Sequence, residues 1–232
     1  MIWWQHIATL LRKDLRLEWR SKERLSPMVF FVLLVLLVFN FGFELGGAAL
    51  GEIGPGVLWS AVLFASLIGL QRTFTAEDAD DCLDGILASP VSRSSLYVAK
   101  MAGNFLFLLA VELITLPLFG LFFNLTVGAY LAPLLIVFAL GSTCIASVGT
   151  LFAAMAGHSR LREFFLPLLS LPILIPALIS CVEATSLILA AGVPGHTTLW
   201  PDGLGTHLAM LAASGVICFF LALLLFDFVM EE

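Results

Sequence analysis

The sequence predicts an all-α integral membrane protein, with six transmembrane helices, an N-terminal interfacial helix and a cytoplasmic helix between the second and third spans. Hydrophobic residues make up 60% of the chain and charged residues only 12%, whereas about a quarter of the residues in soluble domains are charged. Several apolar runs reach the roughly 20 residues that cross a bilayer as a helix. We expect one transmembrane domain over residues 1–232, with spans near residues 27–43, 55–70, 101–123, 130–156, 164–190 and 207–229.

The positions of the basic residues predict the orientation of these spans. If Met1 is cytoplasmic, the outer loops carry only Glu44, Glu52 and Asp202 as charges. Lys and Arg resist translocation, so both termini are expected in the cytoplasm. Six basic residues precede the first apolar run and no small-residue cleavage site follows it, so the first span is expected to remain in the protein. The inner segments hold all eleven basic residues: Arg12, Lys13, Arg16, Arg20, Lys22, Arg24, Arg72, Arg93, Lys100, Arg160 and Arg162.

The first 25 residues have the pattern of an amphipathic helix that lies along the membrane surface. Arg12, Arg16 and Arg20 follow one another at i, i+4 spacing, which is typical of the polar face of an interfacial helix. Asp14 and Glu18 fall within the opposite, apolar arc. Either they pair within the helix with Lys13, Arg20 or Lys22, or this part of the helix faces another protein. The apolar arc consists of Trp3, Ile7, Leu10, Leu11 and Leu17.

Residues 71–100 form the longest polar interruption of the chain. Thr75 and Asp78 have the spacing of a capping box, Pro90 ends the helical pattern, and Ser92 is placed to cap the next helix. The pattern indicates a short helix with an acidic face. It is either a solvated helix resting on the membrane or a docking helix for a soluble partner. Its acidic positions are Glu77, Asp80, Asp81 and Asp84, and its apolar positions are Ala79, Cys82, Leu83, Ile86 and Leu87.

Three further segments have distinctive composition. The fourth span is rich in small residues such as Gly149 and Ala153, which allow close approach of helices. Pro167, Pro172 and Pro176 predict that the fifth span is kinked or broken. Residues 191–206 are too many for a tight turn, and we expect this outer loop to dip into the membrane edge.

Few residues within the spans carry reactive groups. Glu112 lies near the middle of the third span, where a charged carboxylate costs about 2.5–3.5 kcal/mol. It is either a proton or cation site, or a neutral acid bonded to a Ser or Thr of a neighbouring helix.

His196 and His207, on the outer side, are the histidines placed to ligate haem iron, although scattered loop histidines are more often unliganded. The cysteines have no metal-binding spacing and are expected to pack in helices.

The sequence lacks the motifs of an ATP-hydrolysing enzyme. It contains no GxxxxGK[ST] phosphate loop, no GxSxG and no HExxH. A membrane chain with an acidic cytoplasmic helix but no nucleotide site is consistent with a non-catalytic permease that a separate ATPase drives.

Four stretches resemble the haem exporter B family in content and order. They are DLRLEWR at 14–20, GPGVLW at 54–59, DGILASPVSRSSLYVAK at 84–100 and LPLLSLPILIP at 166–176. That family is the membrane subunit of the ABC transporter for cytochrome c maturation, in the bacterial inner membrane. The resemblance implies a six-helix fold like that of ABC-2-type exporters, with an interfacial helix at 1–25 and a cytoplasmic coupling loop at 71–100.

The resemblance also implies the partners and their contacts. They are a cytoplasmic ABC ATPase that binds ATP, a haem-handling membrane partner, a periplasmic haem chaperone and a second copy of the chain. No cofactor is expected on this chain, and haem is handled by the complex. The coupling helix would span about 76–89, with Asp14, Glu18, Arg72 and Arg93 as further candidates for the cytoplasmic interface. The candidate ATPase contacts are Glu77, Asp80, Asp81, Cys82, Leu83, Asp84, Ile86 and Leu87.

Overall fold

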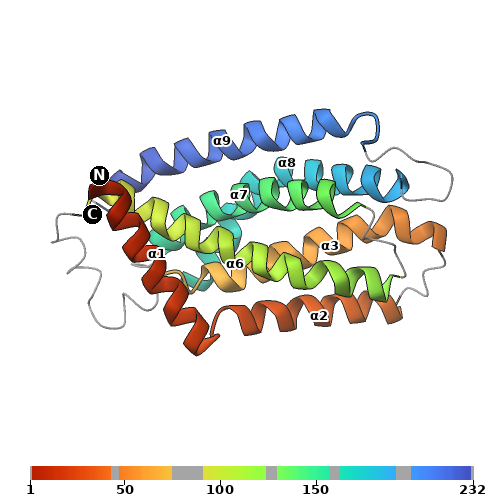
Figure 1. The fold of residues 1–232 in the computed structure, drawn as a ribbon, viewed down its shortest axis with the longest axis horizontal. Coiled ribbons are helices and arrows are strands. Elements are labelled where there is room, and N and C mark those ends of the chain that lie inside the picture. Colours follow the sequence, from red (N-terminus) through yellow and green to blue (C-terminus); the bar gives the residue numbers. More distant parts are fainter. Residues whose placement is uncertain are drawn as a thin grey trace.

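Seven helices and no strand occupy the described residues of the computed structural model (Figure 1). These residues are 2–42, 47–74, 91–123, 130–156, 162–191 and 200–230, with side chains described except at 2, 47–52 and 162–165. Six of the helices are long and apolar enough to span a membrane, which confirms the predicted class. The helices are α1 (Ile2–Ser21), α2 (Leu25–Gly42), α3 (Gly47–Leu70), α6 (Arg93–Phe122), α7 (Leu131–Ala156), α8 (Arg162–Ala191) and α9 (Leu204–Val229).

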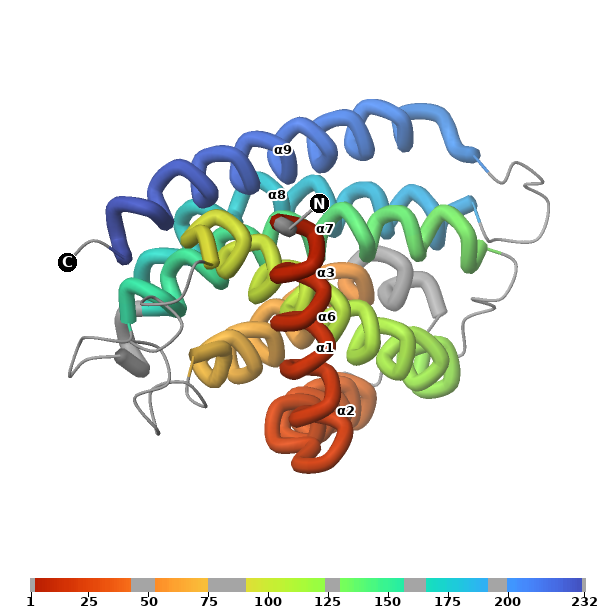
Figure 2. Tube along the Cα trace, turned by 60° about the vertical axis from the view of Figure 1, so that its left-hand side comes forward, coloured from red at the N-terminus to blue at the C-terminus, as the bar shows by residue number. Residues whose placement is uncertain are grey.

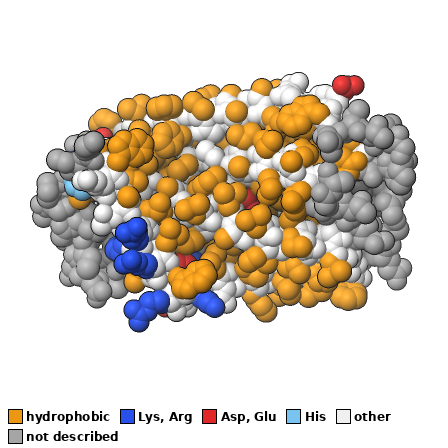
Figure 3. Space-filling view, viewed as in Figure 1, with side chains coloured by type: hydrophobic (Ala, Val, Ile, Leu, Met, Phe, Trp, Pro, Cys, Tyr) orange, Lys and Arg blue, Asp and Glu red, His pale blue; other side chains and the backbone are white. Residues whose placement is uncertain are grey.

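The six spanning helices lie side by side along the long axis, and α1 crosses one end of the bundle (Figures 1 and 2). We call this end the basic end. It holds α1, the first residues of α2, α6 and α8, and the last residues of α3, α7 and α9. In the face shown in Figure 3, Lys and Arg side chains gather at this end, and apolar side chains cover the length of the bundle. The described Lys and Arg side chains are Arg12, Lys13, Arg16, Arg20, Lys22, Arg24, Arg72, Arg93 and Lys100.

Helix α6 begins eight residues before the predicted third span, at Arg93 instead of residue 101. Ser92 caps it as predicted: its backbone is extended, and its Oγ accepts a hydrogen bond from the Ser95 amide at 3.3 Å. Lys100, which the sequence assigned to a loop, therefore lies in the second turn of a continuous helix. Hydropathy misplaced this boundary because the first two turns of α6 include two serines and two cations.

Helix α7 lies at the centre of the bundle and packs against α3, α6, α8 and α9. Its glycines set the closest of these contacts. A Cβ on Gly141 would lie 2.8 Å from Cζ3 of the Trp59 indole and 2.9 Å from Cys181 Sγ. A Cβ on Gly149 would collide with the Leu70 side chain. The small residues of this span therefore allow close approach, as the sequence predicted.

Helix α8 is continuous from Arg162 to Ala191 and includes Pro167, Pro172 and Pro176. The sequence predicted a kinked or broken helix; the break was wrong, and a kink at these prolines stays a prediction. Each proline removes one backbone donor, but unwinding a turn within a membrane would leave several more backbone groups without partners. Retaining the helix therefore leaves fewer unpaired groups than breaking it.

Two hydrogen bonds join neighbouring helices at the end opposite to the basic end. Asn40 Nδ2 donates to the Phe122 carbonyl, which connects α2 to α6. The Tyr130 hydroxyl donates to the Ala191 carbonyl at 2.9 Å, which connects the start of α7 to the end of α8. Most of the outer loop predicted at 191–206, namely residues 192–199, lies outside the described residues, so its dip into the membrane edge stays a prediction.

Candidate functional site

The buried face of α1 packs on the protein rather than on lipid. Ile7 is 7% exposed, and Leu11 Cδ1 lies 3.6 Å from the position of a Cβ on Gly103 of α6. Trp3 and Leu17, which the sequence placed on the same arc, are 38% and 50% exposed, so they are not part of this buried face, and their contact with the membrane stays a prediction. The buried arc continues instead through Asp14 and Glu18, because each of these carboxylates has cationic or amide partners inside the chain.

Asp14 forms an ion pair with Lys100 across the α1–α6 interface. Asp14 Oδ2 lies 3.0 Å from Lys100 Nζ, and the two residues are 6% and 2% exposed. Lys13 Nζ is 3.6 Å from Asp14 Oδ1, so the predicted pairing within the helix is present as well. Removing one member of a buried pair leaves an uncompensated charge in a poorly solvated site. The pair therefore fixes α1 to α6.

Glu18 connects α1 to the first turn of α2. Its Oε1 accepts hydrogen bonds from the backbone amides of Arg24 and Leu25, both at 2.9 Å. These amides belong to the group of helix N-terminal donors that have no partner within the helix. Glu18 Oε2 lies 4.0 Å from Arg24 Nε. The predicted pairing of Glu18 with Arg20 or Lys22 is thus replaced by contacts across the bend between α1 and α2.

The carbonyl of Thr73, just after α3, is the common acceptor of two cations, the buried Lys100 and the partly buried Arg24. Lys100 Nζ donates to it at 3.2 Å and Arg24 Nη2 at 3.3 Å. The Thr73 hydroxyl donates to Asn104 Oδ1 at 3.2 Å, and Asn104 Nδ2 donates to Thr150 Oγ1 of α7 at 2.8 Å. We call Asp14, Glu18, Arg24, Thr73, Lys100 and Asn104 the basic-end cluster.

Arg72 and Arg93 are not buried as Asp14 and Glu18 are. Arg72 Nη1 donates to the Glu23 carbonyl at 3.3 Å and lies 4.0 Å from Glu23 Oε2. Arg93 Nη1 donates to the Asp227 carbonyl at 3.5 Å. Asp14 and Glu18 are buried within the chain, whereas the two arginines are on the accessible side. A contact of any of the four with another protein stays a prediction.

The predicted acidic helix at 76–89 lies outside the described residues, with its eight candidate contacts Glu77, Asp80, Asp81, Cys82, Leu83, Asp84, Ile86 and Leu87. The structure does place both ends of the segment that contains it. Thr73 and Phe74 precede it and are 0% and 1% exposed, and Ser92 follows it as the cap of α6. The segment therefore begins directly at the basic-end cluster, which connects α1, α2, α3, α6 and α7.

Glu112 is buried in the middle of the bundle, at 1% exposure. Ser142 of α7 donates to its Oε1 at 2.7 Å. The expected partner, a Ser or Thr on a neighbouring helix, is therefore present. Glu112 Oε2 has no hydrogen-bond partner among the described residues.

A second buried polar contact was not predicted from the sequence. The Trp59 indole Nε1 donates to Thr185 Oγ1 at 2.9 Å, joining α3 to α8, and the Thr185 hydroxyl donates to the Cys181 carbonyl at 2.8 Å. Trp59 is 1% exposed, and its ring centroid lies 5.3 Å from that of Phe138. A tryptophan in mid-span is the available sequence signal, because a buried indole N–H requires an acceptor.

Other candidate ligands remain separate in the part of the chain that the structure describes. No group of three or more His, Cys, Asp or Glu side chains is close enough there to hold a metal ion. His207 lies in the first turn of α9, and no described residue bonds to its buried Nδ1. His196 lies outside the described residues. Cys144 and Cys181 are buried free thiols, in agreement with their predicted packing role.

Comparison with known proteins gives one consistent result. The family model described as CcmB protein matches residues 5–226. The chain is 30% identical to "Heme exporter protein B" of Rhodobacter capsulatus over 177 residues, which are 76% of this chain and 81% of that protein. It is 31% identical to the protein of the same name from Paracoccus denitrificans, covering 77% and 81% of the two chains. For the Haemophilus influenzae protein of that name, the identity is 28%, with coverage of 86% and 95%.

Proposed function

Because the chain belongs to the CcmB protein family, we propose that it is the membrane permease subunit of an ABC transporter complex that handles haem for c-type cytochrome biogenesis. The observation that carries this proposal is the family match over residues 5–226. The complex either exports haem or uses ATP to release the haem-loaded periplasmic chaperone. The chain itself is a non-catalytic subunit that binds no cofactor, and ATP is hydrolysed by its partner.

In this proposal the protein lies in the bacterial inner membrane with its basic end in the cytoplasm. The concentration of Lys and Arg at that end supports the orientation. The cytoplasmic ABC ATPase binds at the basic end. A haem-handling membrane partner and a periplasmic haem chaperone complete the complex, in which two copies of the chain associate.

The basic-end cluster supplies the route by which the ATPase acts on the spans. The acidic helix at 76–89 would contact the ATPase, and its chain enters the bundle at Thr73. Arg24 and Lys100 both bond to the Thr73 carbonyl, and Asp14 and Glu18 of α1 hold these two cations. A displacement of the acidic helix would therefore act on α1, α2 and α6 as well as on α3.

Charge reversal tests the docking role of the acidic helix. The triple variant Asp80→Lys, Asp81→Lys and Asp84→Lys is expected to abolish co-purification of the ATPase, or to uncouple ATP hydrolysis from release of the haem chaperone. The physical reason is that like charges placed across an interface cost several kcal/mol. Co-purification, ATPase rate and c-type cytochrome content are the measurements.

A matched control neutralises the three acidic residues that the sequence predicts on the outer side. The variant Glu44→Gln, Glu52→Gln and Asp202→Asn adds no positive charge to translocated segments and should retain the ATPase. Retention of the ATPase and of coupled hydrolysis by the first variant would show that the docking assignment is wrong. Loss of the ATPase from both variants would indicate a folding defect and would also count against the docking assignment.

A second candidate function is a proton-coupled carrier that uses Glu112, and the unpartnered Glu112 Oε2 is the observation that favours it. We expect Glu112→Gln to retain c-type cytochrome production, because the Gln oxygen can still accept from Ser142 while the titratable group is lost. Glu112→Ala should lower the free energy of unfolding by about 1 kcal/mol, since interhelical bonds in membranes are modest. Loss of function in Glu112→Gln, with unchanged stability, would favour the carrier instead.

A third candidate is a permease of the same fold for another hydrophobic substrate. Deletion of the protein separates it from the main proposal. Loss of c-type cytochromes, with no other export defect, would exclude it.

A further inference from the structure

The exposed surface of α1 is cationic and lacks any acidic side chain. Arg12, Arg16 and Arg20 are exposed at i, i+4 spacing. The two acidic residues of this helix, Asp14 and Glu18, are turned inward and are 6% and 5% exposed. The positive charge on the outer face of α1 is therefore not balanced by carboxylates of the same helix.

Two grooves border this cationic face. One, of about 1060 Å³, runs along α1 and is lined by Arg12, Arg16, Trp19 and Arg20 among others. The other, of about 510 Å³, lies at the bend between α1 and α2 and is lined by Trp19, Lys22 and Val29 among others. Trp19 borders both grooves and is 84% exposed. The indole thus has little contact with the rest of the protein.

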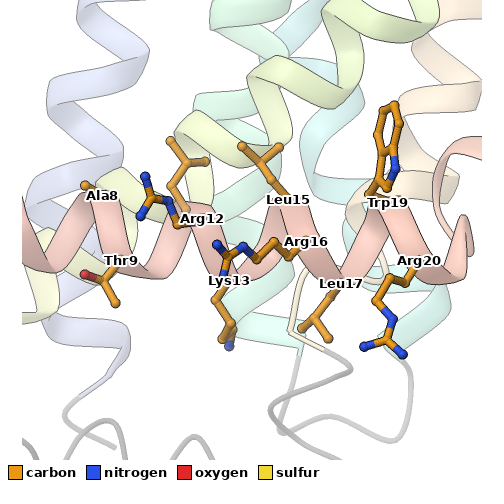
Figure 4. Close-up of a pocket in the computed structure, with 10 residues that line it drawn as sticks. Ala8, Thr9, Arg12, Lys13, Leu15, Arg16, Leu17, Trp19 and Arg20 are labelled. Carbon is orange, nitrogen blue, oxygen red and sulfur yellow. The ribbon is translucent and has the colours of Figure 1, made fainter.

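The side chains that line the larger groove point in different directions (Figure 4). Leu15 and Trp19 point along the spanning helices, whereas Lys13, Leu17 and Arg20 point the other way. Arg12 and Arg16 extend along α1 between these two groups. Only residues 22–24 separate α1 from the spanning helix α2. This helix is therefore held at the level where a bilayer changes from acyl chains to headgroups, which is where tryptophan rings concentrate.

We propose that the groove along α1 binds an anionic phospholipid of the same leaflet. Its phosphate would lie against the Arg12 and Arg16 guanidinium groups, which can bind phosphate with two hydrogen bonds each. Its acyl chains would lie against Leu15 and Trp19. Charge complementarity selects an anionic over a zwitterionic lipid. The apolar direction of Leu15 and Trp19 selects a lipid over a free phosphate. This proposal is independent of whether an ATPase binds the acidic helix.

Native mass spectrometry of the full-length protein, purified in neutral detergent with its companion subunits, tests this site. The protein is titrated with equal amounts of phosphatidylglycerol and phosphatidylcholine carrying the same acyl chains. The wild type should retain phosphatidylglycerol preferentially. Because each basic residue near a membrane surface contributes about fivefold, Arg12→Gln with Arg16→Gln should weaken phosphatidylglycerol binding by about 25-fold. Phosphatidylcholine binding should not change.

The matched control removes two basic residues at the same end but outside α1. Arg72→Gln with Arg93→Gln should leave both lipids bound as in the wild type, because these arginines already contact Glu23 and the Asp227 carbonyl. Water-soluble glycerol phosphate should not displace the lipid. The proposal is overturned if both double variants lose phosphatidylglycerol equally, or if one variant loses both lipids equally. It is also overturned if glycerol phosphate displaces the lipid, or if a protein subunit is lost while the lipid is retained.

Discussion

Replacing Asp14 with asparagine is expected to lower the free energy of unfolding by about 3 kcal/mol, the lower end of the range for breaking a buried ion pair. Asparagine keeps the shape of the side chain but removes the charge 3.0 Å from Lys100 Nζ. Lys100 is only 2% exposed, so water cannot substitute for the lost carboxylate. Unfolding in detergent micelles, followed by circular dichroism, measures the change.

Two variants separate the effect of charge from that of general damage. Glu23→Gln removes the carboxylate of an exposed pair, 4.0 Å from Arg72, and should cost less than about 1 kcal/mol. Asp14→Leu combined with Lys100→Met replaces the buried pair by apolar side chains and should recover stability to within about 1 kcal/mol of the wild type. If Asp14→Asn costs no more than Glu23→Gln, the pair does not hold α1 in place.

Truncation of Trp59 to alanine is expected to cost about 3 kcal/mol. Trp59 is among the largest fully buried side chains, packs on Phe138 and Gly141, and bonds to Thr185. Truncation of a buried tryptophan costs about 3–5 kcal/mol in soluble proteins. We expect the lower value because lipid chains, unlike water, do not drive apolar groups together. The cost of the truncation therefore comes mainly from the cavity that it leaves. The same unfolding measurement applies.

Trp4→Ala provides the matched control for this prediction. Trp4 is a tryptophan of the same chain but is 69% exposed, so its removal leaves no internal cavity and should change stability by less than about 0.5 kcal/mol. Trp59→Phe should lie between the two, because it keeps the ring contacts but removes the donor to Thr185. A cost for Trp59→Ala as small as that for Trp4→Ala would contradict close packing between α3, α7 and α8.

The number and order of the spans could be predicted from hydropathy, because each span needs an apolar run long enough to cross the hydrocarbon core of the bilayer. The second, third and sixth spans begin earlier in the structure than predicted, because their helices extend beyond the apolar run. Helix α3 begins at Gly47 instead of residue 55, and α9 at Leu204 instead of residue 207. Composition reports which residues tolerate hydrocarbon, whereas a helix continues until its backbone donors and acceptors find other partners.

The basic-end cluster could not be predicted because its contacts join distant parts of the chain. Asp14 and Lys100 are 86 residues apart in sequence, and periodicity within α1 shows only that Asp14 lies on an apolar arc. The sequence indicated that Asp14 and Glu18 were anomalous, but not that α6 and α2 supply their partners. The partner of Glu112 was easier to predict, because burial in a span limits its hydrogen-bond donors to hydroxyl groups on neighbouring helices. Ser142 is that donor.

The shared use of the Thr73 carbonyl limits how this membrane protein can change shape. The Thr73 carbonyl oxygen accepts hydrogen bonds from both Arg24 and Lys100, so a shift of this oxygen strains two hydrogen bonds at once, one to the residue before α2 and one to α6. Displacing Thr73 therefore either breaks both hydrogen bonds or moves the end of α3, the start of α2 and α6 together.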